Sequence, residues 1–226
     1  MILDGEAFPD RESRGGVVTA PDRDSRRALV GVLARAFRDN PMNVRIHGPD
    51  PDRRVRANAA GLRSLVLDHG DRLVSRVIAL DSGVVGGFVL VPPGERALPT
   101  PSLRRQVECL FLQGRAAMAA WADVTAGVPD HRPQGPHWYV AVLGVEPACQ
   151  GRGLGAALLG AIGDLVARDP APLALECDRP ESVSFYRAHG FEIRAEERVL
   201  GLPVWGLGRG VDGPAPPEGP DLPRPR

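Results

Sequence analysis

Lysine is absent from this chain of 226 residues, whose 28 basic residues are all arginine. Without lysine, the protein can neither form a Schiff base with a carbonyl substrate nor use a P-loop lysine to hold a nucleotide phosphate. Arginine in place of lysine, together with abundant alanine, glycine and proline, is typical of a GC-rich genome. We therefore expect a bacterial protein.

Cysteine is also scarce. Cys109, Cys149 and Cys177 are too few and too widely separated for a disulfide framework or a four-ligand zinc site. We expect three free thiols and no bound metal.

The chain lacks an excess of charge of either sign and has no long apolar run. Its 28 acidic residues balance its 28 basic residues, and the arginines are spread among the acids. This pattern indicates neither a nucleic-acid partner nor an anionic membrane partner. No segment approaches the roughly 18 apolar residues of a membrane span, and the first residues carry acidic side chains, unlike a signal peptide. We therefore expect a cytoplasmic protein.

Length and composition predict one folded domain. Hydrophobic residues make up 43% of the chain, enough for a well-buried core, and we assign residues 15–209 to this domain. Residues 1–14 are expected to be a flexible N-terminus. From Gly210 the sequence GVDGPAPPEGPDLPRPR offers almost nothing to bury, so residues 210–226 are predicted to be a disordered, proline-rich tail.

Hydrophobic periodicity predicts alternating strands and helices. We expect strands at 17–19, 73–80, 84–91, 138–145, 173–177, from 191 and at 199–207, and helices at 22–40, 55–70, 102–126, 154–166 and 180–189. The stretches 92–101 and 129–136 are expected to be loops. The segment 138–177 forms a βαβ unit.

A glycine-rich loop opens the helix of this unit. In VEPACQGRGLGAALLG, three glycines (Gly151, Gly153 and Gly155) precede an apolar helical pattern. Unpaired amides and the helix dipole at such a helix start form a site for a phosphate or pyrophosphate, and glycine lets the ligand approach the backbone. Arg152 adds a positive charge suited to phosphate oxygens. The other interpretation is a glycine-tolerant turn with a solvated arginine.

A dinucleotide site is the main competing hypothesis. Gly151, Gly153 and Ala156 satisfy the loose pattern G-x-G-x-x-A, and Glu176 follows near the end of the next strand. However, residues 146–150 separate the preceding strand from the first glycine, whereas the dinucleotide turn is tight. Too little chain also follows Cys177 to complete a doubly wound sheet.

The same segment resembles the GNAT superfamily of N-acetyltransferases. Their pyrophosphate loop reads [QR]-x-x-G-x-[GA], here Gln150 to Gly155, followed by a strand ending in ALEC and by SFYRAHGF. Within the superfamily, the likeness is strongest to the puromycin N-acetyltransferases, over residues 131–209. The resemblance implies an α/β (α+β) fold: a mixed, mostly antiparallel central sheet with a splayed parallel strand pair, flanked by helices on both faces.

The resemblance also implies acetyl-CoA as co-substrate, with its pantetheine arm in the wedge between the splayed strands. The residues implied in its binding are Leu143, Gly144, Val145, Gln150, Gly151, Arg152, Gly153, Leu154, Gly155, Ala156, Ser182 and Tyr186. Leu143 and Val145 would offer backbone hydrogen bonds. Gly144 marks either a bulge where the strands diverge or a place of close packing. Ser182 departs from the asparagine that the superfamily often carries there.

Two residues are implied in catalysis, Tyr186 and Glu176. Tyr186 would protonate the departing thiolate, since a phenol with a pKa near about 10 can act as an acid; packing beside Phe185 is the alternative. Glu176 is the leading general base, and Glu146 is the second candidate, with an exposed carboxylate at the loop start as its other interpretation.

Two further possibilities involve histidine and cysteine. His137 is a possible proton relay, although a lone histidine before a strand is more often structural. An acyl-cysteine mechanism through Cys149 or Cys177 is disfavoured, because no histidine is evidently paired with either.

We expect the chain to acetylate a primary amine of a small molecule, an antibiotic or a metabolite, by direct attack, as a monomer or homodimer. The alternatives are peptide or protein N-acetylation, which needs an open groove, and a non-catalytic acyl-CoA-binding module. The long helix expected at 102–126 favours an enclosed small-molecule pocket.

Overall fold

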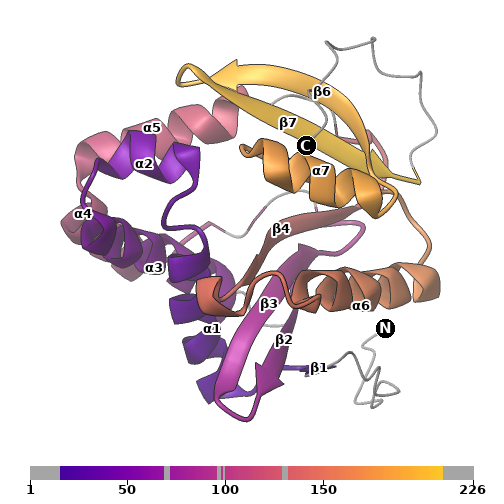
Figure 1. The fold of residues 1–226 in the computed structure, drawn as a ribbon. Coiled ribbons are helices and arrows are strands. Elements are labelled where there is room, and N and C mark those ends of the chain that lie inside the picture. Colours follow the sequence, from indigo (N-terminus) through magenta and orange to yellow (C-terminus); the bar gives the residue numbers. More distant parts are fainter. Residues whose placement is uncertain (1–15, 69–71, 96–97, 99, 129–131, 211–226) are drawn as a thin grey trace.

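The computed structural model describes residues 16–68, 72–95, 98, 100–128 and 132–210. The predicted flexible N-terminus lies outside the described residues, and so does the predicted disordered tail apart from Gly210. Figure 1 shows a central sheet between two groups of helices.

The sheet has seven strands in the order β1-β2-β3-β4-β5-β7-β6. The strands are β1 (Val17–Thr19), β2 (Val74–Leu80), β3 (Gly83–Val91), β4 (Trp138–Val145), β5 (Leu173–Cys177), β6 (Glu192–Val199) and β7 (Leu202–Arg209). Every neighbouring pair is antiparallel except β4 and β5, which run parallel. The predicted fold class, a mixed and mostly antiparallel sheet with helices on both faces, is confirmed.

The helices cover the two faces of this sheet unequally. They are α1 (Arg23–Ala36), α2 (Pro41–His47), α3 (Pro51–Leu67), α4 (Leu103–Gln113), α5 (Arg115–Gly127), α6 (Leu154–Arg168) and α7 (Pro180–Ala188). The core on one face is built with α6 and α7, and contains Leu158, Ile162 and Val183. The core on the other face is built with α1 and α3, and contains Leu29 and Leu33. In Figure 1, α6 and α7 lie on one side of β4 while α1 to α5 gather on the other.

The helix predicted at 102–126 is two helices. Gly114 has a φ of +88°, a conformation that ends α4 and begins α5. The stripe expected to be buried is exposed even within α4, whose buried residues are Arg105 and Gln113. Leu103 and Phe111 of α4 are 76% and 83% exposed. A single glycine within a periodic helical pattern does not by itself reveal a break of this kind.

Two other elements differ from the sequence prediction. The short helix α2 was not predicted; it begins at Pro41, a residue expected to end the preceding helix, because proline is favourable in the first turn of a helix. The strand predicted at 199–207 spans a hairpin turn. Leu200 and Gly201 both have positive φ there and separate β6 from β7. Leucine is unusual at such a position, so the turn has a weak sequence signal.

At Gly144, α1 lies close to β4. A Cβ atom at Gly144 would lie 2.9 Å from Leu33 Cδ2, 3.2 Å from Ala36 Cβ and 3.3 Å from Phe37 Cε2. We expect Gly144→Ala to lower the free energy of unfolding by about 1 to 3 kcal/mol through overpacking. Gly163→Ala in α6 is the matched control, because a Cβ there meets Arg209 only at 3.7 Å. Urea denaturation measures both; equal stability of the two variants would contradict the close-packing role.

Candidate functional site

A wedge opens between the two parallel strands. β4 and β5 pair through only two positions, Trp138 with Leu173 and Tyr139 with Ala174. Beyond them β4 continues beside β3, while β5 continues beside β7. The two strands therefore diverge toward their C-terminal ends and form the splayed parallel pair that was predicted.

The divergence begins at a bulge in β4. Val89 pairs with Val142 and Leu90 pairs with Val140, so Ala141 is an extra residue on β4. A bulge bends its strand, and this one directly follows the last β4–β5 pairing. Of the two interpretations given for Gly144, the bulge is wrong: Gly144 pairs regularly with Gly87, and the close approach of α1 requires a glycine there. Its alternative interpretation, close packing, is the one that the contacts support.

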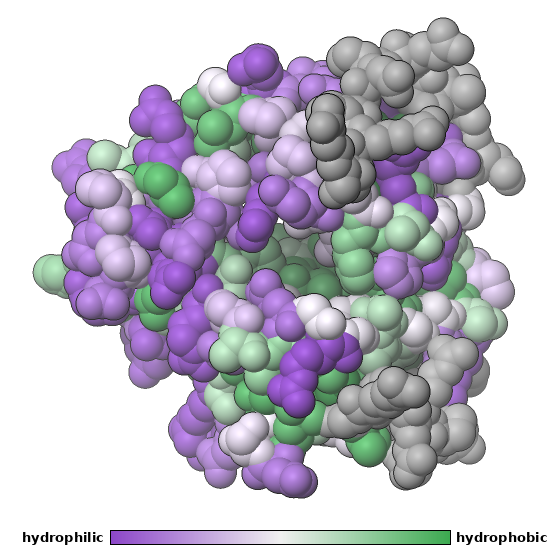
Figure 2. Space-filling model, in the orientation of Figure 1, coloured by the Kyte–Doolittle hydropathy of each residue, from purple (hydrophilic) through white to green (hydrophobic). Residues whose placement is uncertain are grey.

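Figure 2 shows the molecular surface hollowed at its centre, between α7 and the start of α6. The floor of this hollow is mostly hydrophobic, and hydrophilic residues surround much of its rim. An apolar cleft with a polar rim suits a ligand that has an apolar arm and a charged end.

The glycine loop lies at the start of α6. Gly151 and Gly153 have φ of +74° and +82°, and a Cβ atom on either would have no neighbour within 4 Å. The first main-chain bond of α6 runs from the Ala157 N–H to the Gly153 carbonyl, at 3.0 Å. The amides of Leu154, Gly155 and Ala156 precede it and are left without a helical partner. The loop thus presents open space, unpaired donors and the positive end of a helix dipole.

The remaining predicted loop residues have separate structural roles. Gln150 donates from Nε2 to the Val145 carbonyl at 3.0 Å, which ties the loop to the end of β4. The Arg152 side chain is exposed, whereas Leu154 is buried in the core. At Gly155 a Cβ atom would lie 3.3 Å from Phe185 Cζ, so this glycine permits close packing of α6 against α7.

Glu146 begins the loop and is held by α1. Arg35 donates from Nε to Glu146 Oε1 at 2.9 Å and from Nη2 to Oε2 at 2.7 Å, a two-pronged ion pair. The interpretation of Glu146 as an exposed, solvated carboxylate is therefore wrong, because both of its carboxylate oxygens accept from Arg35. The ion pair fastens the C-terminal part of α1 to the start of the loop.

Tyr186 and Ser182 lie one turn apart on α7, so they share a face of the helix. The Tyr186 side chain is buried, with its ring edge against Phe185 and Phe191. Among the described residues its hydroxyl has no hydrogen-bond partner. Burial, and then the nearby Cys177 sulfur, raise the pKa of the phenol above its usual range, so Tyr186 stays protonated at neutral pH.

Cys177 ends β5 beside the wedge. Burial raises the pKa of its thiol to about 12, so it is not a thiolate at neutral pH. Cys109, Cys149 and Cys177 are all free thiols, as predicted. A thiol that is fully protonated at neutral pH is a poor nucleophile, which weighs against an acyl-cysteine at Cys177.

Glu176 lies on the other face of β5, within a hydrogen-bonded cluster. Arg132 donates from Nε to Glu176 Oε1 at 2.9 Å, and the Tyr139 hydroxyl donates to Oε2 at 2.5 Å. The guanidinium of Arg132 also stacks 3.8 Å from the centre of the Tyr139 ring. The side chain of Glu176 is only 10% exposed. These two hydrogen bonds fix the position of the carboxylate.

Asp178 follows β5 and reaches toward α2. Its Oδ2 accepts from the Met42 N–H at 2.8 Å, and its Oδ1 accepts from Asn40 Nδ2 at 3.2 Å. Burial is the main cause of a raised pKa at this carboxyl. His137, by contrast, precedes β4 at the end where the parallel strands are paired, and its Nδ1 lies 2.8 Å from the Gly135 carbonyl. The structure therefore does not bring His137 to the open end of the wedge.

Tyr186 and Glu176 lie on opposite faces of the sheet. Tyr186 belongs to the core between the sheet and α6 and α7, while Tyr139, the partner of Glu176, packs on the α1 and α3 face. A reacting group held in the wedge can meet an acid from one face and a carboxylate from the other. The described residues contain no group of three or more His, Cys, Asp or Glu arranged to hold a metal ion. No helix within them has both the length and the apolar character of a membrane span.

Sequence reasoning missed four of these residues. Arg132 and Asp178 carry no local signal, because their partners lie 44 and 136 residues away. Ala141 was missed since a bulge at alanine leaves no compositional trace. Tyr139 had a usable signal: it pairs with Ala174, two residues from Glu176 and on the same face of the sheet.

The known proteins that this chain is similar to are acetyltransferases of one family. The model of the acetyltransferase (GNAT) domain matches residues 113–193. A mycothiol acetyltransferase of Clavibacter sepedonicus is 30% identical over 194 residues, which cover 73% of this chain and 64% of that protein. A second, from Clavibacter michiganensis subsp. michiganensis, is 30% identical over 207 residues, covering 77% of this chain and 67% of that protein. This chain thus spans about two thirds of each relative, and both are named for mycothiol rather than for puromycin.

The fold is also similar to that of solved acetyltransferase structures. A crystal structure from Corynebacterium glutamicum, described as a histone acetyltransferase and related acetyltransferase, superposes with a TM-score of 0.62. It covers 92% of this chain and 99% of its own, at 19% sequence identity. At that identity the likeness concerns the fold alone.

Proposed function

Because this chain belongs to the GNAT acetyltransferase family, we propose that it transfers an acetyl group from acetyl-CoA to a primary amine of a small molecule. One observation carries the proposal: β4 and β5 pair for two residues and then diverge, with the open N-terminus of α6 beside the gap. The amine attacks the thioester directly, without an acyl-enzyme.

In this proposal the α6 loop holds the pyrophosphate of acetyl-CoA. The positive φ of Gly151 and Gly153, and the open space around both, fit a ligand that approaches the backbone. The exposed guanidinium of Arg152 neutralises phosphate charge. The pantetheine arm follows the apolar wedge, where main-chain groups of Leu143 and Val145 are its hydrogen-bond partners.

Tyr186 is proposed as the acid that protonates the departing thiolate. Its raised pKa keeps the proton on the phenol at neutral pH, where the acid is needed in its protonated form. Ser182, on the same face of α7, is proposed to contact the co-substrate one turn away.

Glu176 is proposed to receive the acceptor from the α1 and α3 face of the sheet. Its carboxylate attracts an ammonium group and accepts a proton from it, directly or through one water. Arg132 and Tyr139 position the carboxylate. Glu146, bound in two prongs by Arg35, is assigned instead to orienting the loop.

We expect Glu176→Gln to lower kcat and to remove the acidic limb of its pH profile, because the amide accepts no proton. If Glu176 only anchors the ammonium, the KM of the amine will rise while kcat stays near its original value. Steady-state kinetics with varied amine distinguish the two roles. Glu146→Gln is the matched control, since it removes the same charge from the other candidate base. Unchanged kinetics of Glu176→Gln, with loss of the acidic limb in Glu146→Gln, would transfer the role to Glu146.

The acceptor is best sought with a thiol-release assay. The names of the two curated relatives suggest the non-acetylated form of mycothiol, and the sequence resemblance suggests puromycin. Aminoglycosides, polyamines, amino acids and short peptides complete the panel. Turnover with a small amine supports the proposal, and turnover confined to peptides would replace it with peptide acetylation. Acetyl-CoA binding without turnover of any acceptor would indicate a non-catalytic binding module.

A further inference from the structure

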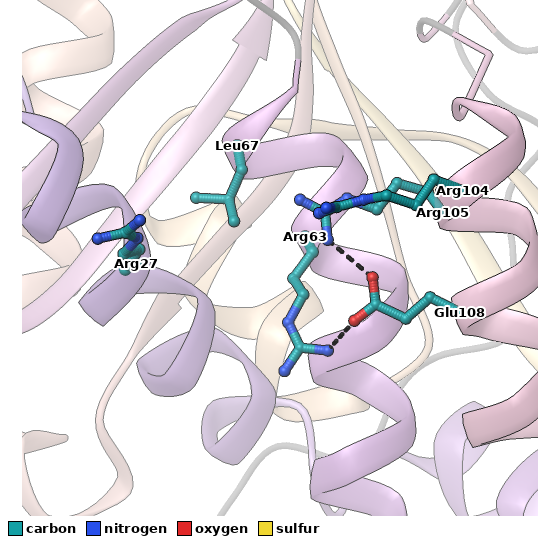
Figure 3. A pocket seen from close by; sticks show the side chains of 6 residues that line it. All are labelled: Arg27, Arg63, Leu67, Arg104, Arg105 and Glu108. Carbon is teal, nitrogen blue, oxygen red and sulfur yellow. Dashed lines mark hydrogen bonds and ion pairs between the residues drawn. The ribbon is translucent and has the colours of Figure 1, made fainter.

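An arginine-lined pocket lies where three helices meet, away from the wedge. It is formed by the first turn of α1, the last turns of α3 and the first turns of α4. Two adjoining hollows of about 560 and 530 Å³ share Arg27, Leu67, Arg104 and Arg105. Figure 3 shows Arg27 on one side and Arg63, Arg104 and Arg105 on the other, with the Glu108 carboxylate bonded to both Arg63 and Arg105. We call this feature the arginine pocket; its arginines are Arg23, Arg26, Arg27, Arg63, Arg104 and Arg105.

The arginine pocket has an excess of positive charge. Its six arginines face only three carboxylates, on Asp22, Asp68 and Glu108. This imbalance is local, because the whole chain has a formal net charge of zero. Guanidinium groups gathered on low-dielectric walls repel one another and produce a field that attracts anions.

Each of the three carboxylates is already engaged within the protein. Asp22 caps α1 by accepting from the Ser25 N–H at 2.8 Å. Asp68 accepts from Arg105 Nε at 2.6 Å. Glu108 accepts from Arg105 Nη1 at 2.7 Å and also from Arg63. These bonds neutralise Arg63 and Arg105 and hold them rigidly; the Arg105 side chain is only 8% exposed.

Three of the other four arginines keep their charge available. Arg23, Arg26 and Arg104 form no ion pair with any described residue, and Arg27 pairs with Asp24 at an exposed surface position. First-turn residues of α1 and α4 line the same region, and the positive ends of the two helix dipoles add to its potential. A fixed arginine floor under several unneutralised guanidinium groups is an arrangement that binds multivalent oxyanions, since guanidinium forms paired hydrogen bonds to phosphate and carboxylate.

We propose that the arginine pocket binds a small oxyanion with at least two negative charges, a phosphate ester or a polycarboxylate. The pocket is distinct from the proposed acetyl-CoA site. Arg27 lies eight positions before Arg35 on α1, or about 12 Å along the helix axis. Arg35 is the partner of Glu146 at the loop. Its volume fits a molecule the size of a small metabolite.

The test compares two double variants with the same loss of charge. The double variant Arg27→Gln and Arg104→Gln removes two exposed guanidinium groups that line the arginine pocket. Arg45→Gln with Arg56→Gln removes two exposed arginines elsewhere and is the matched control. Calorimetric titrations with inorganic pyrophosphate, inorganic phosphate and citrate are made at constant ionic strength. Saturating acetyl-CoA is present throughout, so that the α6 loop is not the site that the anion occupies.

We expect the pocket variant to bind the preferred anion at least tenfold more weakly than the original protein, and the control variant to bind it equally well. Preference for pyrophosphate or phosphate over citrate identifies a phosphorylated ligand; the reverse identifies a polycarboxylate. Because the substituted side chains are exposed, the melting midpoints without anion should match, and acetyl-CoA should stabilise all variants alike. No binding of any of the three anions, or equal losses in both variants, would overturn the proposal. Binding of an oligonucleotide without binding of these anions would also overturn it, in favour of a nucleic-acid surface.

Discussion

Replacement of Gly153 by valine is expected to abolish the stabilisation of the protein by acetyl-CoA. Gly153 is the N-cap of α6 with φ of +82°, and no atom lies within 4 Å of the position of a Cβ. A valine side chain would fill this space, where we propose that the pyrophosphate lies. It would also resist the left-handed conformation that aims the first α6 amides outward, since a β-branched residue is strained there. Differential scanning fluorimetry with and without acetyl-CoA measures the loss. At an acetyl-CoA concentration about 100 times its Kd, binding should stabilise the original protein by about 2.7 kcal/mol.

The control for this variant is Gly163→Ala, on the same helix. A Cβ at Gly163 makes an ordinary contact with Arg209, so acetyl-CoA should stabilise this variant as it does the original protein. The Gly153→Val protein must also melt cooperatively without ligand, which separates loss of binding from loss of the fold. Should the exposed Arg152 be replaced by glutamine, a smaller decrease in affinity is expected, because one charge is lost while the backbone donors remain. A normal acetyl-CoA shift in Gly153→Val would rule out this loop as the pyrophosphate site.

Tyr186→Phe is expected to lower kcat by about ten- to a thousandfold with little change in acetyl-CoA affinity, since only proton donation in the transition state is lost. The ring stays packed against Phe185 and Phe191, so stability should change little. Rapid-quench kinetics, under conditions where chemistry limits the rate, measure the effect. Phe185→Leu is the comparison variant, because it alters the neighbouring packing and leaves the hydroxyl. If Tyr186→Phe keeps full turnover, the tyrosine serves packing alone.

The pH dependence gives a second measurement on Tyr186. Burial, and then the Cys177 sulfur, raise the pKa of the phenol above its ordinary value near about 10. The acid therefore remains protonated as the pH rises through the range in which a solvent-exposed tyrosine would ionise. We expect no alkaline decline of kcat from this residue below about pH 10. The contribution of the Tyr186 phenol to the free energy of unfolding is fully present below the pKa that this group has in the unfolded chain. It is lost as the pH rises from there through the raised pKa of the folded protein.

The helix-opening loop was predictable because its signal is local. Gly151 and Gly153 lie within three residues of each other, and the positive φ of both follows from the turn that leads into α6. The predicted order of β4, α6, β5 and α7 is found with closely similar bounds, since each element has a strong apolar periodicity and a proline or glycine at an end. Where the signal was weak, at Gly114 and at the Leu200–Gly201 turn, the predicted elements were wrong.

The partners of the candidate site residues were not predictable in the same way. Glu176 was selected for its position on a strand, yet its properties depend on Arg132, 44 residues away. Glu146 was expected to be exposed, but Arg35, 111 residues away, binds it in two prongs. Both contacts depend on how α1 and the segment before β4 pack against the sheet. Sequence spacing contains no measure of that packing.

From the sequence by itself, the motifs around Gln150 to Gly155 indicated the family and, through that resemblance, the mixed sheet. The order of β4, α6, β5 and α7 followed from glycine, proline and apolar periodicity, which act within a few residues along the chain. Only the tertiary structure decided the bulge at Ala141, the packing role of Gly144 and the two donors on Glu176. It also gathered Arg27, Arg63, Arg104 and Arg105 into one pocket, although the chain as a whole is neutral. Electrostatic fields and close contacts depend on distances in space, and these are set only when α1, α3 and α4 pack together.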